Sequence, residues 1–317
     1  MAKRTLILVL ILLLGLSVRA QQIVFTPQWA AQSQFAGYYV AQELGFYKDA
    51  GVDVVIEHSS TSDMALNRML SGKSNAVTMF LYDAICRIDQ GIGIVNILQT
   101  SQRPGQVVVV RNDSIANLED LQGKRIGIWH SHFNQISQFM NMDYNLNIEW
   151  IMFIQNINLY ISGAVDATMA MIYNEVYWIL SSGFKDKKII PFEDIGYDFP
   201  DEGLYISREY YNKYPDKARA FAEASRKGWE WAHKHPEQAV DIVMKVMERE
   251  KVPASRRHQE WMLREVLKLQ CRKGENVPNF KLDTEKVKEL NKLLLYHGSI
   301  DKEHNVEQIQ GTKVWRK

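Results

Sequence analysis

Apolar runs and turn residues alternate along the first two thirds of the chain and predict strands and helices in turn. From residue 22 to about residue 190, apolar runs of strand length are separated by segments that end near glycine. This alternation is typical of parallel sheets whose strands are connected by helices, so the predicted fold class is α/β. The expected strands are QIVFTP (22–27), VDVVIEH (52–58), NAVTMF (75–80), GIVNILQT (93–100), GQVVVVR (105–111), RIGIW (125–129), IEWIMFI (148–154) and VDATMAMI (165–172).

After residue 209 the pattern changes to apolar positions at helical spacing. Met, Trp and Leu recur there on one face of each segment, which is typical of helices that cover a core and need no cofactor. The expected helices are PDKARAFAEASRKGWEWAHKH (215–235), PEQAVDIVMKVMERE (236–250), SRRHQEWMLREVLKLQ (255–270) and TEKVKELNKLLLYHG (284–298). The chain has 317 residues, which is too long for one small core, so we expect two lobes.

The N-terminus has the pattern of a cleavable secretory signal over residues 1–20. Lys3 and Arg4 precede an apolar run, and a small residue, Ala20, precedes the polar start of the mature chain. The apolar run is about half of the roughly twenty residues that span a bilayer. We therefore expect a periplasmic protein. The whole chain has a formal net charge of +1, which gives no sign of nucleic-acid binding.

The two cysteines and the His-x-His pairs do not have the spacing of a metal or redox site. Cys86 and Cys271 could form a disulfide in an oxidising compartment, but Cys86 lies on a predicted helix beside isoleucines, which favours a buried free thiol. His233 and His235 do not share a helix face. The other pair, at 130 and 132, has no third ligand nearby in the sequence. We expect neither a metal nor a cofactor.

One segment of the sequence recurs ninety-one residues later. SGKSNAVTMFLYD (71–83) is echoed by SGAVDATMAMIYNE (162–175), each with a glycine turn, a buried strand and a polar residue after tyrosine. Ligands of open α/β sheets bind at the carboxyl ends of the strands. The echo therefore predicts two lobes that face each other, with Asp83 on one wall and Asn174 and Glu175 on the other. A glycine turn that recurs by chance is the alternative, and the matching tyrosines weigh against it.

The segment FTPQWAAQSQFAGYYVAQELGFYKDAGVDVVI (25–56), with LSGKSNAV, LEDLQGKRIGIW and GAVDATMAMIYNE, resembles the thiamine pyrimidine synthase-like family. The resemblance runs from about Ile23 to about Tyr211. This family comprises periplasmic substrate-binding proteins of ABC importers and the fungal thiamine pyrimidine synthase. The resemblance implies a two-lobed type II periplasmic binding protein with a ligand cleft between the lobes. Lobe 1 would comprise residues 21–107 and 204–317, and lobe 2 residues 108–203.

The elements that the synthase relative needs for catalysis are missing. Its sacrificial histidine and its lysine for pyridoxal phosphate fall on Asp83 and Met79, and its cysteine-rich loop falls on DFPDEG (198–203). Its glycine-rich phosphate turn aligns with WHSHFN (129–134), which contains no glycine. We therefore predict a binding protein without catalytic residues. The enzyme and a ligand-sensing module are the alternatives.

The candidate ligand-binding residues follow the predicted strands. The indole of Trp29 would stack on a heteroaromatic ring, or pack on the lobe edge. Tyr38 and the adjacent Tyr39 point about 100° apart, so one is expected in the cleft and the other in the core. His130 and Ser131 follow a strand and would bind a hydroxyl or carboxylate, or form an exposed loop.

The acidic and amide candidates complete the set. Glu175 aligns with an acidic family position and would accept hydrogen bonds from an exocyclic amine and a ring nitrogen, or act as a solvated helix cap. Asn174 both donates and accepts. Asp83 would pair with an amine-bearing ligand or cap its own helix. We expect a monomer that captures a small heteroaromatic nutrient, a thiamine pyrimidine precursor being favoured over riboflavin or a sulfonate. Its partner would be an ABC transporter permease.

Overall fold

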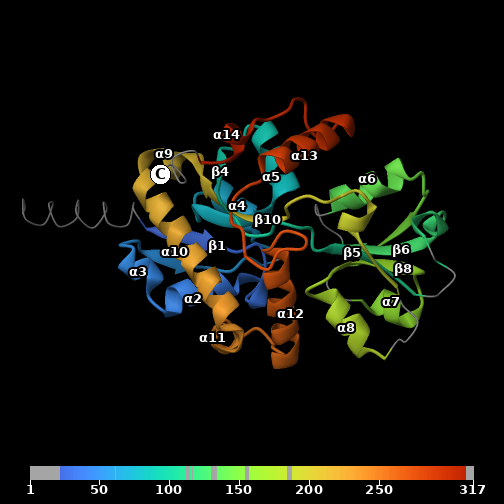
Figure 1. The fold of residues 1–317 in the computed structure, drawn as a ribbon, viewed down its shortest axis with the longest axis horizontal. Coiled ribbons are helices and arrows are strands. Elements are labelled where there is room, and N and C mark those ends of the chain that lie inside the picture. The colour runs from blue at the N-terminus through green and yellow to red at the C-terminus, as the bar shows by residue number, and fades with distance from the viewer. Residues whose placement is uncertain are drawn as a thin grey trace, which may run out of the picture.

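The computed structural model describes residues 22–311, apart from residues 61, 112–114, 116, 130–133, 154–156 and 184–187. The described strands form two five-stranded sheets in two lobes, as Figure 1 shows. The predicted signal over residues 1–20, His130 and Ser131 lie outside the described residues. Within the described ranges, no helix has the length and apolar character needed to cross a bilayer.

The first lobe contains a sheet with the strand order β2-β1-β3-β10-β4. Strand β1 runs parallel to β2 and β3, whereas β10 runs antiparallel to β3 and β4. All five strands coincide with apolar runs of the sequence. Their bounds are β1 Ile23–Thr26, β2 Val54–Ile56, β3 Ala76–Phe80, β4 Ile94–Gln99 and β10 Glu202–Ser207.

The second lobe repeats this topology with the order β7-β6-β8-β5-β9. Strand β6 is parallel to β7 and β8, and β5 is antiparallel to β8 and β9. The bounds are β5 Gln106–Val110, β6 Arg125–Trp129, β7 Glu149–Phe153, β8 Ala167–Met171 and β9 Lys188–Pro191. The sequence pattern predicted parallel sheets, but each sheet holds one antiparallel strand. That strand is the first one after a crossover from the other lobe, and it runs antiparallel between two neighbouring strands of the sheet.

Two crossover segments connect the lobes. The first, residues 100–105, joins β4 to β5, and the second, residues 192–201, joins β9 to β10 and contains the short helix η4 (Phe192–Ile195). We propose the lobe boundaries in these segments, slightly before those suggested by the sequence.

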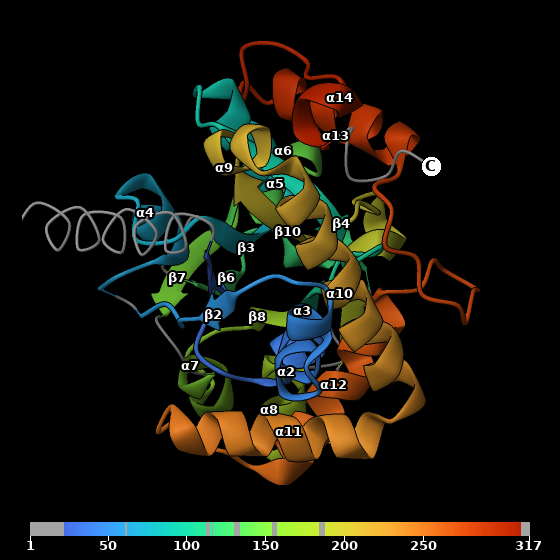
Figure 2. The same cartoon turned by 90° about the vertical axis from the view of Figure 1, so that its left-hand side faces the viewer.

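The helices of each lobe alternate with its strands, and the C-terminal helices cover lobe 1. Lobe 1 has η1 (Ser33–Phe35), α2 (Ala36–Glu43), α3 (Phe46–Asp49), α4 (Ala65–Leu70) and α5 (Leu81–Asp89), and lobe 2 has η2 (Leu118–Leu121), α6 (Gln135–Asp143), α7 (Asn158–Ser162) and α8 (Glu175–Ser181). The C-terminal helices are α9 (Arg208–Lys213), α10 (Pro215–Lys234), α11 (Pro236–Arg249), α12 (Arg256–Leu269), α13 (Thr284–Tyr296) and α14 (Val306–Ile309). Figures 1 and 2 both show α10 beside α2.

The close packing of α10 on α2 depends on two glycines. A Cβ added at Gly37 would lie 2.2 Å from Cδ2 of Trp229, and one at Gly228 would lie 2.0 Å from the carbonyl oxygen of Gly37. The indole of Trp229 therefore fills the space beside Gly37, where it meets the ring of Tyr38 at 5.6 Å. Trp229, Met262 and Leu263 are all buried, which confirms that the C-terminal apolar stripes form core.

Two smaller sequence expectations have different outcomes. Cys86 and Cys271 are both buried and free, as predicted for Cys86. The segment SDMALNRMLSG (62–72) predicts a helix with a Ser/Asp cap, and this cap is wrong, because Met64 occupies the N-cap position of α4 without a side-chain hydrogen bond. Asp63 pairs instead with Arg68 at 2.7 Å.

Candidate functional site

The repeated segment occupies equivalent places in the two lobes. The bounds of β3 and β8 coincide when the sequence is shifted by ninety-one residues. Gly72 precedes β3 with a φ of 73°, and Gly163 precedes β8 with a φ of 80°. The helices that follow differ. Helix α5 begins directly after β3, whereas residues 172–174 separate β8 from α8. The polar residues of the echo therefore have different local settings.

Asp83 and Asn174, which are equivalent in the echo, illustrate this difference. Asp83 lies in the first turn of α5, is buried, and pairs with Arg87 one turn later at 3.1 Å. Asn174 is the N-cap residue of α8, is half-buried, and makes no side-chain cap hydrogen bond. Among the described contacts, the carboxylate of Asp83 has a cation of its own chain as partner, which weakens its candidacy for a ligand amine.

Glu175 is a fixed carboxylate at the carboxyl end of β8. Its side chain is 8% exposed. Oε1 accepts a hydrogen bond from the indole Nε1 of Trp129 at 3.0 Å, and Oε2 accepts one from the backbone N–H of Met171 at 2.8 Å. Burial raises the pKa of Glu175, while hydrogen bonds from the Met171 backbone, Trp129, its own backbone and the Asn174 side chain act in the opposite direction. The carboxylate is therefore held by donors of its own lobe.

The two aromatic candidates of lobe 1 differ in exposure. Trp29 lies in the loop after β1 and is 36% exposed. Tyr38 has no exposed surface and packs against Phe25 at 4.8 Å. The sequence placed one of two adjacent tyrosines in the cleft, but Tyr39 is buried as well, because α10 and α11 cover α2. Burial raises the pKa of Tyr38 well above its ordinary value and the charge of Glu202 raises it further, so Tyr38 stays a candidate for the cleft.

Two buried acids that the sequence pattern did not reveal lie where the second crossover enters lobe 1. The carboxylate of Asp201 accepts a hydrogen bond from the backbone N–H of Gly105 in the first crossover at 3.1 Å. Burial raises the pKa of Asp201 to about 7 and that of Glu202 to about 8. For Glu202, hydrogen bonds from Thr78, Gln34 and Gln28 act against this rise.

Acids of both lobes influence the hydroxyl of Tyr173. Burial raises the pKa of Tyr173 well above its ordinary value, and nearby charges raise it further, in the order Glu202, Asp201, Glu175 and Tyr82. Tyr82 and Tyr173 are the two tyrosines of the echo, so the repeat places its matching residues within electrostatic reach of each other. We call Tyr82, Tyr173, Glu175, Asp201 and Glu202 the junction cluster.

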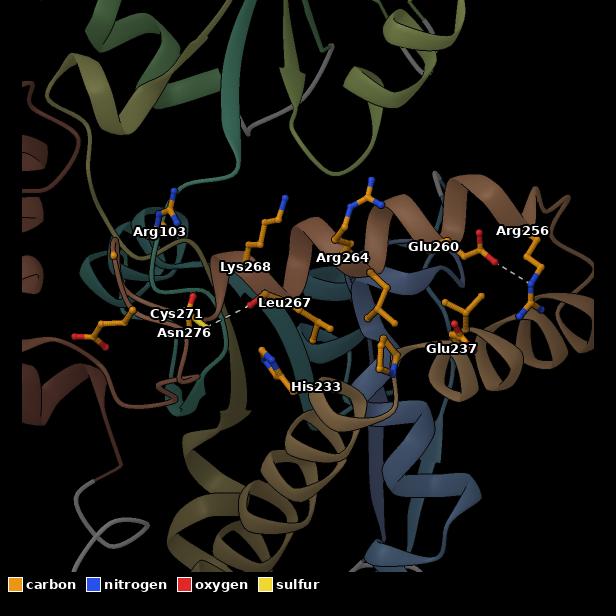
Figure 3. A pocket seen from close by; sticks show the side chains of 15 residues that line it. Arg103, His233, Glu237, Arg256, Glu260, Arg264, Leu267, Lys268, Cys271 and Asn276 are labelled. Carbon is orange, nitrogen blue, oxygen red and sulfur yellow. Dashed lines mark hydrogen bonds and ion pairs between the residues drawn. The ribbon is translucent and has the colours of Figure 1, made fainter.

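A pocket of about 1010 Å³ lies elsewhere, among α10, α11, α12 and Arg103 (Figure 3). Its charged side chains are largely engaged with each other or with neighbours, as in Arg256 with Glu260 at 3.0 Å and Arg103 with Glu193 at 2.7 Å. Because it lies among the helices and away from the strand ends where ligands of such sheets bind, we place the candidate site at the junction cluster. Among the described residues, no group of three or more His, Cys, Asp or Glu side chains is arranged to hold a metal ion.

Comparison with known structures defines the class of fold. The structure matches the crystal structure of the periplasmic aliphatic sulphonate binding protein SsuA from Escherichia coli with a TM-score of 0.67, at 13% identity, over 93% of this chain and 99% of that one. The fold is therefore that of the periplasmic binding proteins, with two α/β lobes. Residues 32–239 match the family described as NMT1/THI5 like, and the chain belongs to this family.

Curated relatives are named as binding proteins. The chain is 23% identical over 233 residues to the riboflavin-binding protein RibY of Chloroflexus aurantiacus, covering 70% of this chain and 65% of that protein. It is also 23% identical over 226 residues to the formylaminopyrimidine-binding protein of Halalkalibacterium halodurans, covering 68% of each. The matched region thus spans about two thirds of these relatives. The family level of the resemblance is confirmed.

Proposed function

We propose that this protein is an extracytoplasmic solute-binding protein that captures an unphosphorylated pyrimidine precursor of thiamine for import by an ABC transporter. The signal pattern at the N-terminus, the fold and the names of the relatives support this role. The observation that carries it is the carboxylate of Glu175, which is buried at the end of β8 with both oxygens oriented by donors of its own lobe.

Glu175 suits the donor edge of an aminopyrimidine. Trp129 and the backbone of Met171 fix the plane of the carboxylate. An exocyclic amine and a protonated ring nitrogen of such a ligand present two parallel donors to a pair of carboxylate oxygens. Binding would also favour the ionised form of Glu175, whose pKa burial has raised.

The charge of Glu175 favours this ligand over an anion. The raised pKa values of Asp201, about 7, and Glu202, about 8, keep these two acids largely protonated near neutral pH, so the carboxylate that a sulfonate would meet is that of Glu175. The half-exposed indole of Trp29 is the candidate surface for stacking on the ring. Riboflavin is the second candidate, because it is also a heteroaromatic ring with N–H donors and a relative is named for binding it.

Thermal unfolding of the mature protein against a ligand panel tests this function. The panel comprises formylaminopyrimidine, thiamine, riboflavin, taurine and pyridoxal phosphate. A ligand at a hundred times its Kd adds about 2.7 kcal/mol to the unfolding free energy, which raises Tm by several degrees. We expect this rise with formylaminopyrimidine, its loss in Glu175→Gln, and its retention in Glu149→Gln, an exposed control on β7.

Other outcomes would reassign the function. A rise with riboflavin alone would move the ligand to the second candidate, and a rise with taurine alone would contradict the charge argument. Stabilisation by pyridoxal phosphate with the absorbance of a Schiff base would support the enzyme alternative.

A further inference from the structure

The loop that carries Trp29 is held by the first residue of β10. Nε2 of Gln28 donates a hydrogen bond to Oε1 of Glu202 at 2.6 Å, and Nε2 of Gln34 donates to the same oxygen at 3.2 Å. Gln28 lies in the loop after β1, next to Trp29, and Gln34 lies in η1, just before α2. One buried carboxyl group therefore ties the Trp29 loop and η1 to β10.

The backbone carbonyl groups of Asp201 and Glu202 accept hydrogen bonds from other segments at the junction of the lobes. The carbonyl of Glu202 accepts hydrogen bonds from the backbone of Ser101 and the hydroxyl of Thr100, both at 2.8 Å, in the first crossover. The carbonyl of Asp201 accepts from the backbone N–H of Leu81 at 2.9 Å, at the start of α5. Both crossovers, the loop after β1 and the start of α5 therefore meet at residues 201 and 202.

The geometry points to Glu202 as a positioning residue that sets the place of the Trp29 loop relative to the crossovers, and so links ligand recognition to the arrangement of the lobes. This inference rests on the proposed function, in which Trp29 stacks on the ligand. Glu202 itself is buried and contacts the loop, so it acts through Gln28 and Gln34.

Replacing the carboxyl group separates this role from a general effect on folding. Glu202→Met keeps the length of the side chain and removes every acceptor. Glu202→Gln keeps one acceptor oxygen for the two glutamines and should rescue the loop. Glu193→Met is the matched control, because Glu193 is an acid of the second crossover with a side chain only 9% exposed, and its partner, Arg103, lies away from the loop.

The first readout is the environment of Trp29. Its emission is obtained as the difference between each variant and the same variant with Trp29→Phe, and acrylamide quenching measures its exposure. We expect quenching of this difference signal to rise about twofold in Glu202→Met and to stay at the wild-type level in Glu202→Gln and Glu193→Met. Gln28→Met removes the same hydrogen bond from the loop side and carries the test if Glu202→Met does not fold.

The second readout is the Kd for formylaminopyrimidine, with riboflavin as the second probe. A lost hydrogen bond to a buried carboxyl group corresponds to about a tenfold or larger change in affinity, so the Kd should rise by that factor in Glu202→Met and by less than about threefold in Glu202→Gln. Unchanged Trp29 quenching in both Glu202→Met and Gln28→Met would overturn the inference. If neither probe binds the wild type, the proposed ligand class fails, while Trp29 quenching still decides the role of Glu202.

Discussion

The imidazole of His258 on α12 stacks on the ring of Tyr177 on α8, with centroids 5.0 Å apart and planes inclined by 29°. The two residues belong to different lobes, and Figure 1 shows α12 beside α8 at the lower junction. Next to this pair, the indole Nε1 of Trp261 donates a hydrogen bond to the carbonyl of Ile172 at 3.0 Å. On the other side, His297 stacks on Phe139 at 4.0 Å. Contacts on both sides thus hold the lobes together.

Acid should loosen the contact at His258. Burial lowers the pKa of His258 to about 4, with a hydrogen bond that the imidazole donates to the Asn174 backbone acting in the opposite direction. In the folded protein His258 therefore stays neutral at pH values at which a solvated histidine, with a pKa of about 6.5, is already protonated. The stability that the neutral imidazole provides is present above that pH and is lost as the pH falls toward 4.

His258→Phe tests this dependence, because it keeps an aromatic ring against Tyr177 and cannot titrate. We expect a Tm close to wild type at pH 7.5 and a smaller fall than wild type between pH 6.5 and 4.5, by a few degrees. Small-angle scattering should show the wild type expanding over this range and the variant remaining compact. Parallel Tm profiles for the two proteins would contradict the assignment.

Asp201 predicts a pH dependence of the opposite sign. Its folded pKa of about 7 lies above the ordinary 3.8, so between these values the folded state retains a proton that the unfolded chain has lost. This contribution to stability is complete at low pH and is lost as the pH rises through 7, by at most about 4 kcal/mol. Asp201→Asn should flatten the profile of unfolding free energy between pH 5 and 8.

Glu202→Gln provides the matched comparison for Asp201→Asn. The folded pKa of Glu202 is about 8, so its variant should remove a decline that extends about one pH unit higher. Urea unfolding at several pH values measures both profiles. If the profiles of both variants ran parallel to that of the wild type between pH 5 and 8, neither acid would be held protonated in the folded protein.

The sequence predicted most of the strands and proposed one wall of the candidate site, because both follow local rules. Apolar runs mark β3 and β8, and the ninety-one-residue echo aligns them with each other. Glu175 was proposed as a ligand-binding residue because it comes shortly after β8 in the chain. The strands, the paired tyrosines and the family are therefore readable from the sequence.

Asp201 and Glu202 could not be found in this way. Asp201 ends a crossover without periodic pattern and Glu202 begins β10, and the partner of Glu202 in the loop, Gln28, is 174 residues away in the chain. The burial of Tyr38 could not be predicted from the sequence either. Helical periodicity separates it from Tyr39 by about 100° but does not reveal that later helices cover both sides of α2.

Gly37→Ala should destabilise lobe 1 through direct overlap. The added methyl group would lie 2.2 Å from Trp229, and Gly228 already brings α10 against the backbone of Gly37, so neither helix can move away. Overpacking of this kind costs about 1–3 kcal/mol or more, which thermal unfolding would record as a lower Tm. Gly93→Ala is the control, because its Cβ would meet Arg208 at 3.4 Å, an ordinary contact. An equal loss in both would contradict this account.

Cys86 offers a chemical probe of lobe opening. It lies on α5 of lobe 1, and its Sγ is 3.5 Å from Nε2 of Gln135 on α6 of lobe 2. Burial raises the pKa of the Cys86 thiol, so a disulfide reagent should react slowly while the lobes stay together. In a Cys271→Ser protein, we expect bound ligand to slow the reaction further. Trp261→Phe should accelerate it, because that substitution removes the hydrogen bond to lobe 2.

The reverse protein, Cys86→Ser, supplies the control for this experiment. It retains Cys271, which lies in the wall of the pocket on lobe 1 and has no contact across the lobes among the described interactions. Its rate of labelling should change with neither ligand nor Trp261→Phe. If both cysteines responded alike, the reaction would report overall unfolding, and the contacts of His258, Trp261 and His297 would not be what holds the lobes together.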